Sequence, residues 1–380
     1  MKFETKVIHA GIEPDPSTGA IMTPIYQTST YVQEAPGKHK GYEYARTQNP
    51  TRSVLEANLT ALENGVDAAC FASGLAAMDA VLKLLSPGDE IITTYELYGG
   101  SYRLMTQIFA KYGIKINFID LNDKTALKNQ INDKTKLIWI ETPTNPMLSI
   151  LDVKYICNLA KKHNIITCVD NTFATPYLQN PIDLGADLVL HSATKYLAGH
   201  SDVILGAVIT ADKELGERLH YIQNASGAVP GPQDCFLTLR GIKTLHLRVQ
   251  RACDNALEIA AYLKNHKKVD KVYYPGFKDA HNHQVAKRQM KHYGAMLSFT
   301  LKSDTKRSAS RILSKTKLFS LAESLGGVES LIGHPASMTH ASIPKKERLS
   351  IGLTDSLIRL SVGVEHVEDL MEDLKAALGG

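Results

Sequence analysis

The sequence predicts an α/β protein built on a mainly parallel sheet with helices on both faces, an extended N-terminal arm and a smaller C-terminal α+β domain. Between about Thr51 and residue 240, apolar strand-like runs alternate with segments long enough to form crossover helices. Before this region the chain shows no sustained period, and after it a long helical stretch replaces the alternation. We therefore expect an arm at residues 1–50, a large domain at 51–240 and a C-terminal domain at 241–380.

The arm is predicted from its glycines and prolines. Residues 1–45 contain these two residue types repeatedly and without a period, at Gly11, Pro14, Pro16, Gly19, Pro24, Pro36, Gly37 and Gly41. Such a pattern is typical of extended or turning chain. No packed element is expected in this part of the chain.

The large domain should begin with a helix over Ser53–Glu63 and contain another from Gly74 to Leu85. Its strand-like runs are Ala68–Phe71, Glu90–Thr93, Lys115–Ile119, Leu137–Ile140, Ile165–Val169, Leu188–Leu190 and Val203–Ile209. The C-terminal domain should contain a long helix over Leu245–Asn265, a closing helix over Val367–Leu378, and strands at Lys271–Tyr274 and Met296–Leu301. Ligands of a parallel sheet bind at the carboxyl ends of its strands, which is where polar residues are sought.

Charge and hydropathy exclude several classes of partner. The chain has 380 residues, 44% of them apolar, and 43 basic and 39 acidic residues leave a net charge of +4. Basic pairs such as Lys267-Lys268 are typical of solvated surface, so no nucleic-acid partner is expected. No apolar run reaches the roughly 18 residues that a membrane span needs, and residues 1–10 lack the apolar core of a signal peptide.

The cysteines indicate a reducing compartment. Cys70, Cys157, Cys168, Cys235 and Cys253 are widely spaced and form no CxxC pair. This spacing favours reduced, structural thiols over disulfides or a zinc site. We therefore expect a cytoplasmic protein.

Lys195 is the first candidate for chemistry. The run His191-Ser192-Ala193-Thr194-Lys195 follows a predicted strand, and so places a lysine and two hydroxyl groups at the ligand-binding edge. A lysine there can form a Schiff base if burial or a cationic neighbour lowers its pKa. Taken alone, it could equally be a surface lysine closing a loop.

Asp170 lies at the same edge, directly after the strand-like run that ends at Val169. A carboxylate beside a pyridine nitrogen favours the protonated ring, which then acts as an electron sink. An aspartate after a strand is also commonly a turn or helix-cap residue.

Two loops could contact the other parts of an aromatic phosphate ligand. Gly74 and Leu75 open a predicted helix, where free amides and the helix dipole would favour a phosphate. Tyr98, after the Glu90–Thr93 run, could stack on an aromatic ring or simply pack on the core. The His281-x-His283 pair lacks further ligands nearby, so a solvated loop is favoured over a metal site, and no metal is expected.

Together these motifs resemble the Cys/Met-metabolism family of enzymes that depend on pyridoxal 5'-phosphate (PLP). The similarity extends over essentially the whole chain. Its ordered matches are Tyr44-Ala45-Arg46, Asn49-Pro50-Thr51-Arg52, Phe71-Ala72-Ser73-Gly74, Leu97-Tyr98-Gly99-Gly100, Glu141-Thr142-Pro143-Thr144-Asn145-Pro146, Val169-Asp170-Asn171-Thr172, Ser192-Ala193-Thr194-Lys195-Tyr196, Ser324-Leu325-Gly326-Gly327 and Arg359-Leu360-Ser361-Val362-Gly363.

The resemblance implies the PLP-dependent transferase fold of the aspartate aminotransferase type, with residues 51–240 as the PLP-binding domain. It implies that Lys195 holds PLP and moves protons, that Asp170 pairs with the pyridinium nitrogen and that Tyr98 stacks on the ring. The phosphate would contact Gly74, Leu75, Ser192 and Thr194 of one subunit and Tyr44 and Arg46 of its neighbour. A homodimer with shared sites follows, usually assembled into a tetramer.

The resemblance also implies a substrate-binding set of Asn145, Ser324 and Arg359. An arginine suits the amino-acid carboxylate because its planar fork donates two parallel hydrogen bonds; an interdomain salt bridge is the alternative. The motifs depart from the family pattern at Ala45, where serine is common, and at Gln48, where glycine is common. If that glycine uses a left-handed conformation, Gln48 alters the arm loop.

The expected activity is that of a trans-sulfuration enzyme acting on the carbon–sulfur bond of cystathionine. A cystathionine γ-lyase is favoured, because two acidic residues adjoin motif positions, Glu43 before Tyr44 and Glu323 before Ser324. Either could bind the remote ammonium of cystathionine, although both could be solvated rim residues. The alternatives are a γ-synthase, a β-lyase that releases homocysteine, pyruvate and ammonia, and a catalytically silent PLP-binding protein.

Overall fold

The computed structural model describes residues 1–341 and 344–379, and its largest element is a seven-stranded sheet. The strand order is β1 (Asp67–Phe71), β7 (Gly206–Thr210), β6 (Leu188–Ser192), β5 (Ile166–Asp170), β4 (Thr135–Glu141), β2 (Glu90–Thr93) and β3 (Lys115–Phe118). Strands β6, β5, β4, β2 and β3 pair in parallel, and β7 is antiparallel to both of its neighbours. The α/β class and the mainly parallel sheet are confirmed.

Helices cover both faces of this sheet because successive residues of a buried strand point to opposite sides. In β4, Leu137 and Trp139 join one apolar cluster, and Ile138 and Ile140 join another. Helices α3 (Gly74–Leu82), α4 (Gly99–Arg103) and α8 (Lys213–Ser226) contribute to the first side; α5 (Lys124–Gln130) and α6 (Val153–Lys162) contribute to the second.

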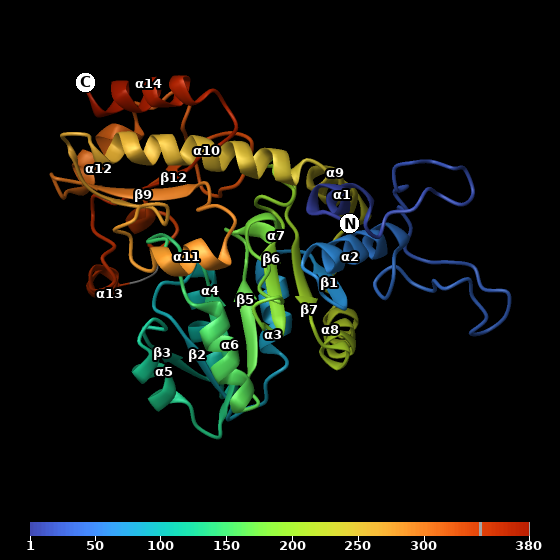
Figure 1. The fold of residues 1–380 in the computed structure, drawn as a ribbon. Helices are drawn as coiled ribbons and strands as arrows, with labels where there is room; N and C mark the ends of the chain where they lie inside the picture. Colours follow the sequence, from blue (N-terminus) through green and yellow to red (C-terminus); the bar gives the residue numbers. More distant parts are fainter. Residues whose placement is uncertain (342–343, 380) are drawn as a thin grey trace.

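A second, five-stranded sheet is formed by the C-terminal part of the chain. Its order is β10 (Ser320–Leu321), β11 (Leu331–Gly333), β12 (Ile358–Ser361), β9 (Met296–Leu301) and β8 (Val269–Tyr273). Helix α10 (Leu245–Lys264) packs against β8 and β9, and α14 (Val367–Leu378) packs against α10 (Figure 1). The remaining helices are α7 (Thr175–Leu178), α9 (Pro232–Ile242), α11 (His283–Gln289), α12 (Lys306–Leu313) and α13 (Lys345–Ser350).

The N-terminal region differs from the expectation in one respect. Helix α1 (Phe3–His9) packs on α2 (Pro50–Leu62) and α10, and Val7 is fully buried there, so the prediction of no packed element is wrong for these residues. The helix is too short to show a clear period in sequence. The rest of the arm extends away from the body in two long loops (Figure 1).

The arm turn resolves the two departures from the family motif. The amides of Thr47 and Gln48 both donate to the carbonyl of Tyr44, at 3.0 Å each. Gln48 is not among the described residues with a left-handed backbone, so no glycine is required at this position. Within the described part of the chain, no helix is long and apolar enough to cross a membrane.

Candidate active site

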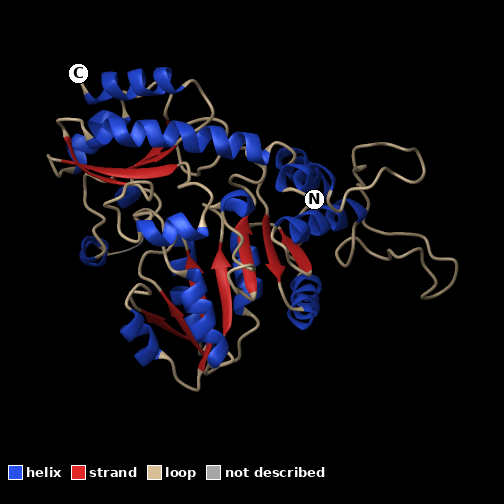
Figure 2. Ribbon diagram, in the orientation of Figure 1, coloured by secondary structure: helices blue, strands red, loops and turns tan. Residues whose placement is uncertain are grey.

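A cavity of about 440 Å³ opens at the carboxyl ends of the parallel strands, on the side where the smaller sheet lies (Figure 2). Strands β4, β5 and β6 end at this edge, as the rule for parallel sheets predicts. The predicted site residues that line the cavity are Gly74, Leu75, Tyr98, Asn145, Asp170, Ser192, Thr194, Lys195, Glu323, Ser324 and Arg359.

Lys195 is held as a largely buried amine. Its Nζ donates to Ser324 Oγ at 2.7 Å, although 129 residues separate the two in the chain. Burial and, secondarily, the charge of Arg359 lower the pKa of Lys195 to about 8. A substantial fraction of the amine is therefore neutral slightly above neutral pH, as nucleophilic or proton-transfer chemistry requires.

Arg359 presents a buried guanidinium at the opposite side of the lysine. Its Nη1 donates to Asn145 Oδ1 and its Nη2 to the carbonyl of Ser324, both at 3.0 Å. Burial lowers the pKa of Arg359 to about 10, so the group still keeps its charge at neutral pH. A fixed fork of this kind suits a carboxylate, and it contacts a cavity that also contains the Lys195 amine.

Ser324 has a backbone φ of +92°, which is unusual for a residue with a side chain. The following Gly326 also has a positive φ, and a Cβ there would lie 2.7 Å from the amide nitrogen of Tyr196. This bent segment places both the hydroxyl and the carbonyl of Ser324 against charged groups of the cavity. Such strain is typical of a site whose geometry is held by surrounding structure.

Asp170 and Glu141 form a buried pair of carboxyl groups at the ends of β5 and β4. Asp170 accepts from the amide of Thr172 at 3.0 Å, and Glu141 accepts from the amide of Tyr98 at 3.0 Å. Burial raises the pKa of both carboxyl groups, and their mutual repulsion further raises that of Glu141. No ion pair within the described residues reaches Asp170, so this buried acid lacks a cationic partner in the protein.

Gly74 begins α3, and Ser73 caps the helix by accepting from the amide of Ala76 at 3.0 Å. A Cβ at Gly74 would lie 2.9 Å from the Cβ of Ser192, so only glycine brings these two segments together. The helix start therefore faces the strand end that leads to Lys195. Its backbone amides form a position suited to an anion.

Tyr98 is 39% exposed and lines the cavity from the loop before α4. A Cβ at Gly100 would lie 2.3 Å from its ring, so the glycine makes room for the aromatic group. This loop is fixed by His340, whose Nε2 lies 3.1 Å from the carbonyls of both Leu97 and Asn145. Two acceptors at Nε2 require that nitrogen to carry the proton.

His340 is a neutral bridge between the two parts of the chain. Burial lowers its pKa to about 4, and its Nδ1 lies 2.8 Å from the hydroxyl of the cavity residue Thr339. Sequence reasoning missed His340, because its partners are more than 190 residues away and nothing local signals them. It also missed the role of Glu141, which the rule on strand ends could have found.

The arm residues do not reach the cavity of their own chain. Tyr44 is 46% exposed, the Arg46 Nε donates to Asn224 Oδ1 at 3.2 Å, and Glu43 pairs with His39 at 3.1 Å. None of the three lines the cavity. The structure thus separates Glu43 from Glu323, which lies exposed at the mouth of the cavity.

The remaining polar candidates are structural. All five cysteines are free and buried, as expected. His283 is buried at the start of α11, with its Nδ1 2.9 Å from the carbonyl of Pro275, so the prediction of a solvated loop is wrong for this residue. Its neighbour Asn282 precedes the helix in a left-handed conformation.

The sequence was then compared with known proteins. A family model described as Cys/Met metabolism PLP-dependent enzyme matches residues 4–379. The chain belongs to this family.

Relatives in the family carry three different activities. A cystathionine β-lyase of Coxiella burnetii is 52% identical, with 99% of this chain and 97% of that protein covered. A cystathionine γ-lyase of Bacillus subtilis is also 52% identical, with 100% and 99% covered. The structure of a cystathionine γ-synthase from Xanthomonas oryzae pv. oryzae superposes with a TM-score of 0.97 at 43% identity, covering 100% of this chain and 98% of that one.

The chain is thus a PLP-dependent enzyme of Cys/Met metabolism, a carbon–sulfur lyase or γ-replacement transferase, and PLP is its cofactor. The cavity fits this group. It offers a buried carboxylate without an ion-pair partner for a protonated ring nitrogen, a helix start closed by Gly74 for a phosphate, and a lysine of lowered pKa.

Proposed function

We propose that this enzyme is a cystathionine γ-lyase, which converts cystathionine to cysteine, 2-oxobutanoate and ammonia. The observation that carries the proposal is the acidic side chain of Glu323 at the mouth of a cavity that contains Lys195 and Arg359. The Bacillus subtilis γ-lyase, matched along its whole length, adds support. We further propose that residues 51–240 bind PLP, that 241–380 form the second domain, and that the enzyme works in the cytoplasm, because its thiols are free and buried.

Lys195 would hold PLP, with Asp170 facing the ring nitrogen and Tyr98 the ring. Gly74, Leu75, Ser192 and Thr194 would hold the phosphate. When bound, PLP supplies a protonated pyridine ring that withdraws electrons from the α-carbon of an amino acid. The protein's part is to place the substrate against that ring and to move protons.

Arg359 would bind the α-carboxylate of the substrate through its charged fork, with Asn145 holding the guanidinium in place. The Lys195 amine, released by substrate, would then take the α-proton, since its lowered pKa keeps part of it neutral. The hydroxyl of Ser324 accepts from the same amine and fixes its direction.

Glu323 would recognise the far end of cystathionine. Its negative charge raises the pKa of both Lys195 and Arg359, so it acts on the same space as these two cations. Cystathionine differs from shorter sulfur amino acids in its second ammonium group, which extends beyond the sulfur atom. An exposed carboxylate at the cavity mouth is placed to bind that ammonium and to orient the chain for elimination.

Replacement of Glu323 by alanine should raise KM for cystathionine by roughly five- to tenfold, the scale of a partly exposed ion pair. KM for substrates without the remote ammonium should change little, which steady-state kinetics on both substrate types would measure. Glu329→Ala is the matched control, because Glu329 is exposed on the same segment but does not line the cavity. Equal changes for both substrate types would remove Glu323 from this role.

Product analysis distinguishes the γ-lyase from its two alternatives, which named relatives of similar identity keep open. We expect cysteine, 2-oxobutanoate and ammonia from cystathionine. Homocysteine and pyruvate as main products would instead establish a β-lyase. Robust synthesis of cystathionine from an acylated homoserine and cysteine, with little cleavage, would establish a γ-synthase.

We also propose that the active enzyme is a homodimer with shared sites, assembled into a tetramer. The arm extends away from its own cavity, with Tyr44 and Arg46 exposed near its base (Figure 1). In this arrangement both residues contact the phosphate of PLP in the neighbouring subunit, and Glu43 approaches the same site. An exposed arginine is a suitable phosphate ligand because of its fixed charged fork.

Arg46→Ala should weaken the binding of PLP by about tenfold, which corresponds to one charged hydrogen bond. Mixed oligomers of Arg46→Ala and Lys195→Ala chains should regain activity, because one of their sites combines an intact lysine with an intact arm. Cofactor titration and activity after chain exchange measure the two effects. Demonstrated exchange without regained activity would refute the shared site.

A further inference from the structure

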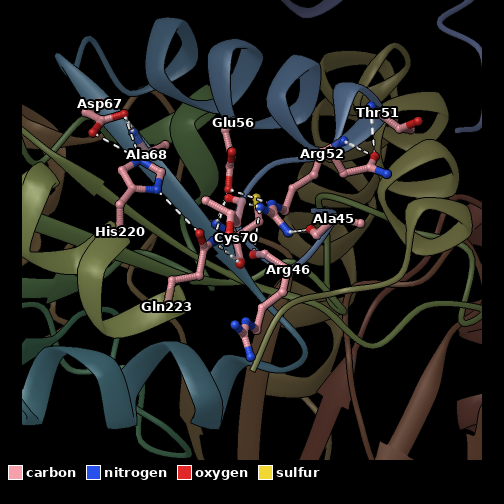
Figure 3. Close-up of polar contacts among 12 residues, drawn as sticks. Ala45, Arg46, Thr51, Arg52, Glu56, Asp67, Ala68, Cys70, His220 and Gln223 are labelled. Atoms are coloured by element: carbon pink, nitrogen blue, oxygen red, sulfur yellow. Dashed lines mark hydrogen bonds and ion pairs between the residues drawn. The ribbon is translucent and has the colours of Figure 1, made fainter. Parts of the chain in front are cut away.

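Arg52 grips the backbone of the arm from the first turn of α2. Its Nη1 donates to the carbonyl of Ala45 at 3.0 Å, and its Nη2 donates to those of Arg46 at 3.2 Å and Thr47 at 2.7 Å. The side chain is only 2% exposed, and Figure 3 shows it between α2 and the turn of the arm. One guanidinium thus satisfies three successive carbonyls of a segment that otherwise has little regular structure.

The other side of Arg52 is tied to the large sheet. Its Nε lies 3.5 Å from Glu56 Oε1, and that oxygen accepts from the amide of Cys70 on β1 at 2.9 Å. Gln223 of α8 donates to the same oxygen at 3.1 Å and to the carbonyl of Cys70 at 2.6 Å. The grip on the arm is therefore anchored to β1 and α8, which are rigid parts of the large sheet (Figure 3).

The start of α2 holds a second point of the arm as well. Thr51 Oγ1 donates to the carbonyl of Pro24 at 2.8 Å and accepts from the amide of Tyr26 at 2.9 Å. Asn49 donates to the carbonyl of Tyr26 at 2.9 Å while its Oδ1 caps the helix. The arm is fixed where it leaves α2, on both its outgoing and returning segments.

Arg46 itself directs its side chain away from this cluster (Figure 3). Arg52 contacts the backbone of Arg46 and does not line the cavity, so it cannot bind the cofactor of its own chain. Its position instead determines where the exposed Arg46 and the neighbouring Tyr44 are presented.

We propose that Arg52 is a positioning residue that prearranges the arm turn so that Arg46 and Tyr44 reach the PLP phosphate of the partner subunit. This inference rests on the shared site proposed above. A loose turn would have to be ordered each time the phosphate is bound, and that entropy cost would lower affinity. A buried fork that holds three carbonyls removes most of this cost before the subunits meet.

The test compares Arg52→Met with three matched variants. Removing Arg52 alone leaves Glu56 buried without its cation, and burial already raises the pKa of that carboxyl group, so the single variant is destabilised. The double variant Arg52→Met with Glu56→Gln removes this uncompensated acid and keeps the fold testable. Glu56→Gln alone retains the grip on the arm and is the control, and Arg52→Lys tests partial rescue.

The double variant should bind PLP about tenfold more weakly, as Arg46→Ala does, while Glu56→Gln binds normally and Arg52→Lys lies between. Dissociation constants are measured by titration of the apoprotein with PLP. In mixed oligomers with Lys195→Ala chains, the double variant should regain activity, because its defect lies in the arm that it donates. Its thermal midpoint should stay close to that of Glu56→Gln.

Two results would overturn the inference. If Arg46→Ala weakens PLP binding and the double variant does not, Arg52 does not position the arm, although the shared site stands. If the double variant fails to complement Lys195→Ala chains while Arg46→Ala succeeds, Arg52 serves only its own subunit. An unchanged PLP affinity in Arg46→Ala would instead refute the shared site itself.

Discussion

Lys195→Ala should abolish turnover and the visible absorption that PLP gains when it is joined to a lysine. Loss of the proton transfer alone lowers the rate by roughly 10²–10⁴-fold, and loss of the covalent hold on PLP adds to it. Absorption spectra and steady-state kinetics of the purified protein measure both effects.

Two variants sharpen this result. Lys195→Arg keeps a positive charge but offers no neutral amine near neutral pH, so it should be as inactive as the alanine variant. Lys83→Ala, which removes a surface lysine paired with Asp79, should leave spectrum and rate unchanged. Turnover by Lys195→Ala at the normal rate would remove Lys195 from its proposed role.

Asp170→Asn should lower kcat by roughly 10²–10³-fold, the scale of deleting one preorganised electrostatic contact. The change keeps the size of the side chain and its bond to the Thr172 amide, but removes the charge that would hold a proton on the ring nitrogen. Because burial raises the pKa of Asp170 and it has no ion-pair partner in the described chain, only a cationic ligand favours its ionised form.

Nitrogen NMR of labelled PLP would report the protonation of the ring nitrogen directly, independently of rate. Glu141→Gln is the informative comparison, because Glu141 is equally buried but its carboxylate already accepts from the amide of Tyr98. We expect the ring nitrogen to lose its proton in Asp170→Asn and to keep it in Glu141→Gln. The reverse pattern would assign the ring nitrogen to Glu141.

Much of the fold and about half of the cavity could be predicted because their signals are local. Strand periods and the rule on strand ends indicate Asp170, Ser192 and Lys195 from short stretches of sequence. The meeting of Arg359 with Asn145 across 214 residues depends on how the two sheets pack, which no local pattern encodes. Resemblance to a family indicated these residues, whereas the contacts that hold them came from the structure.

The errors have physical causes as well. Helix α1 has one fully buried side chain, Val7, which is too weak a signal to distinguish a short packed helix from an arm. His283 appears polar in sequence, but packing against Pro275 buries it.

The bridge made by His340 bears on how this enzyme can be redesigned. One imidazole holds the carbonyls of Leu97 and Asn145, and the adjacent carbonyl of Thr339 would lie 2.3 Å from any Cβ at Gly99. A loop grafted at residues 334–341 must therefore bring matching residues at 97–99 and 145 from the same donor. Glu323 lies on the exposed rim outside this bridge, so libraries aimed at new substrates can vary position 323 while the interlocked loops remain as they are.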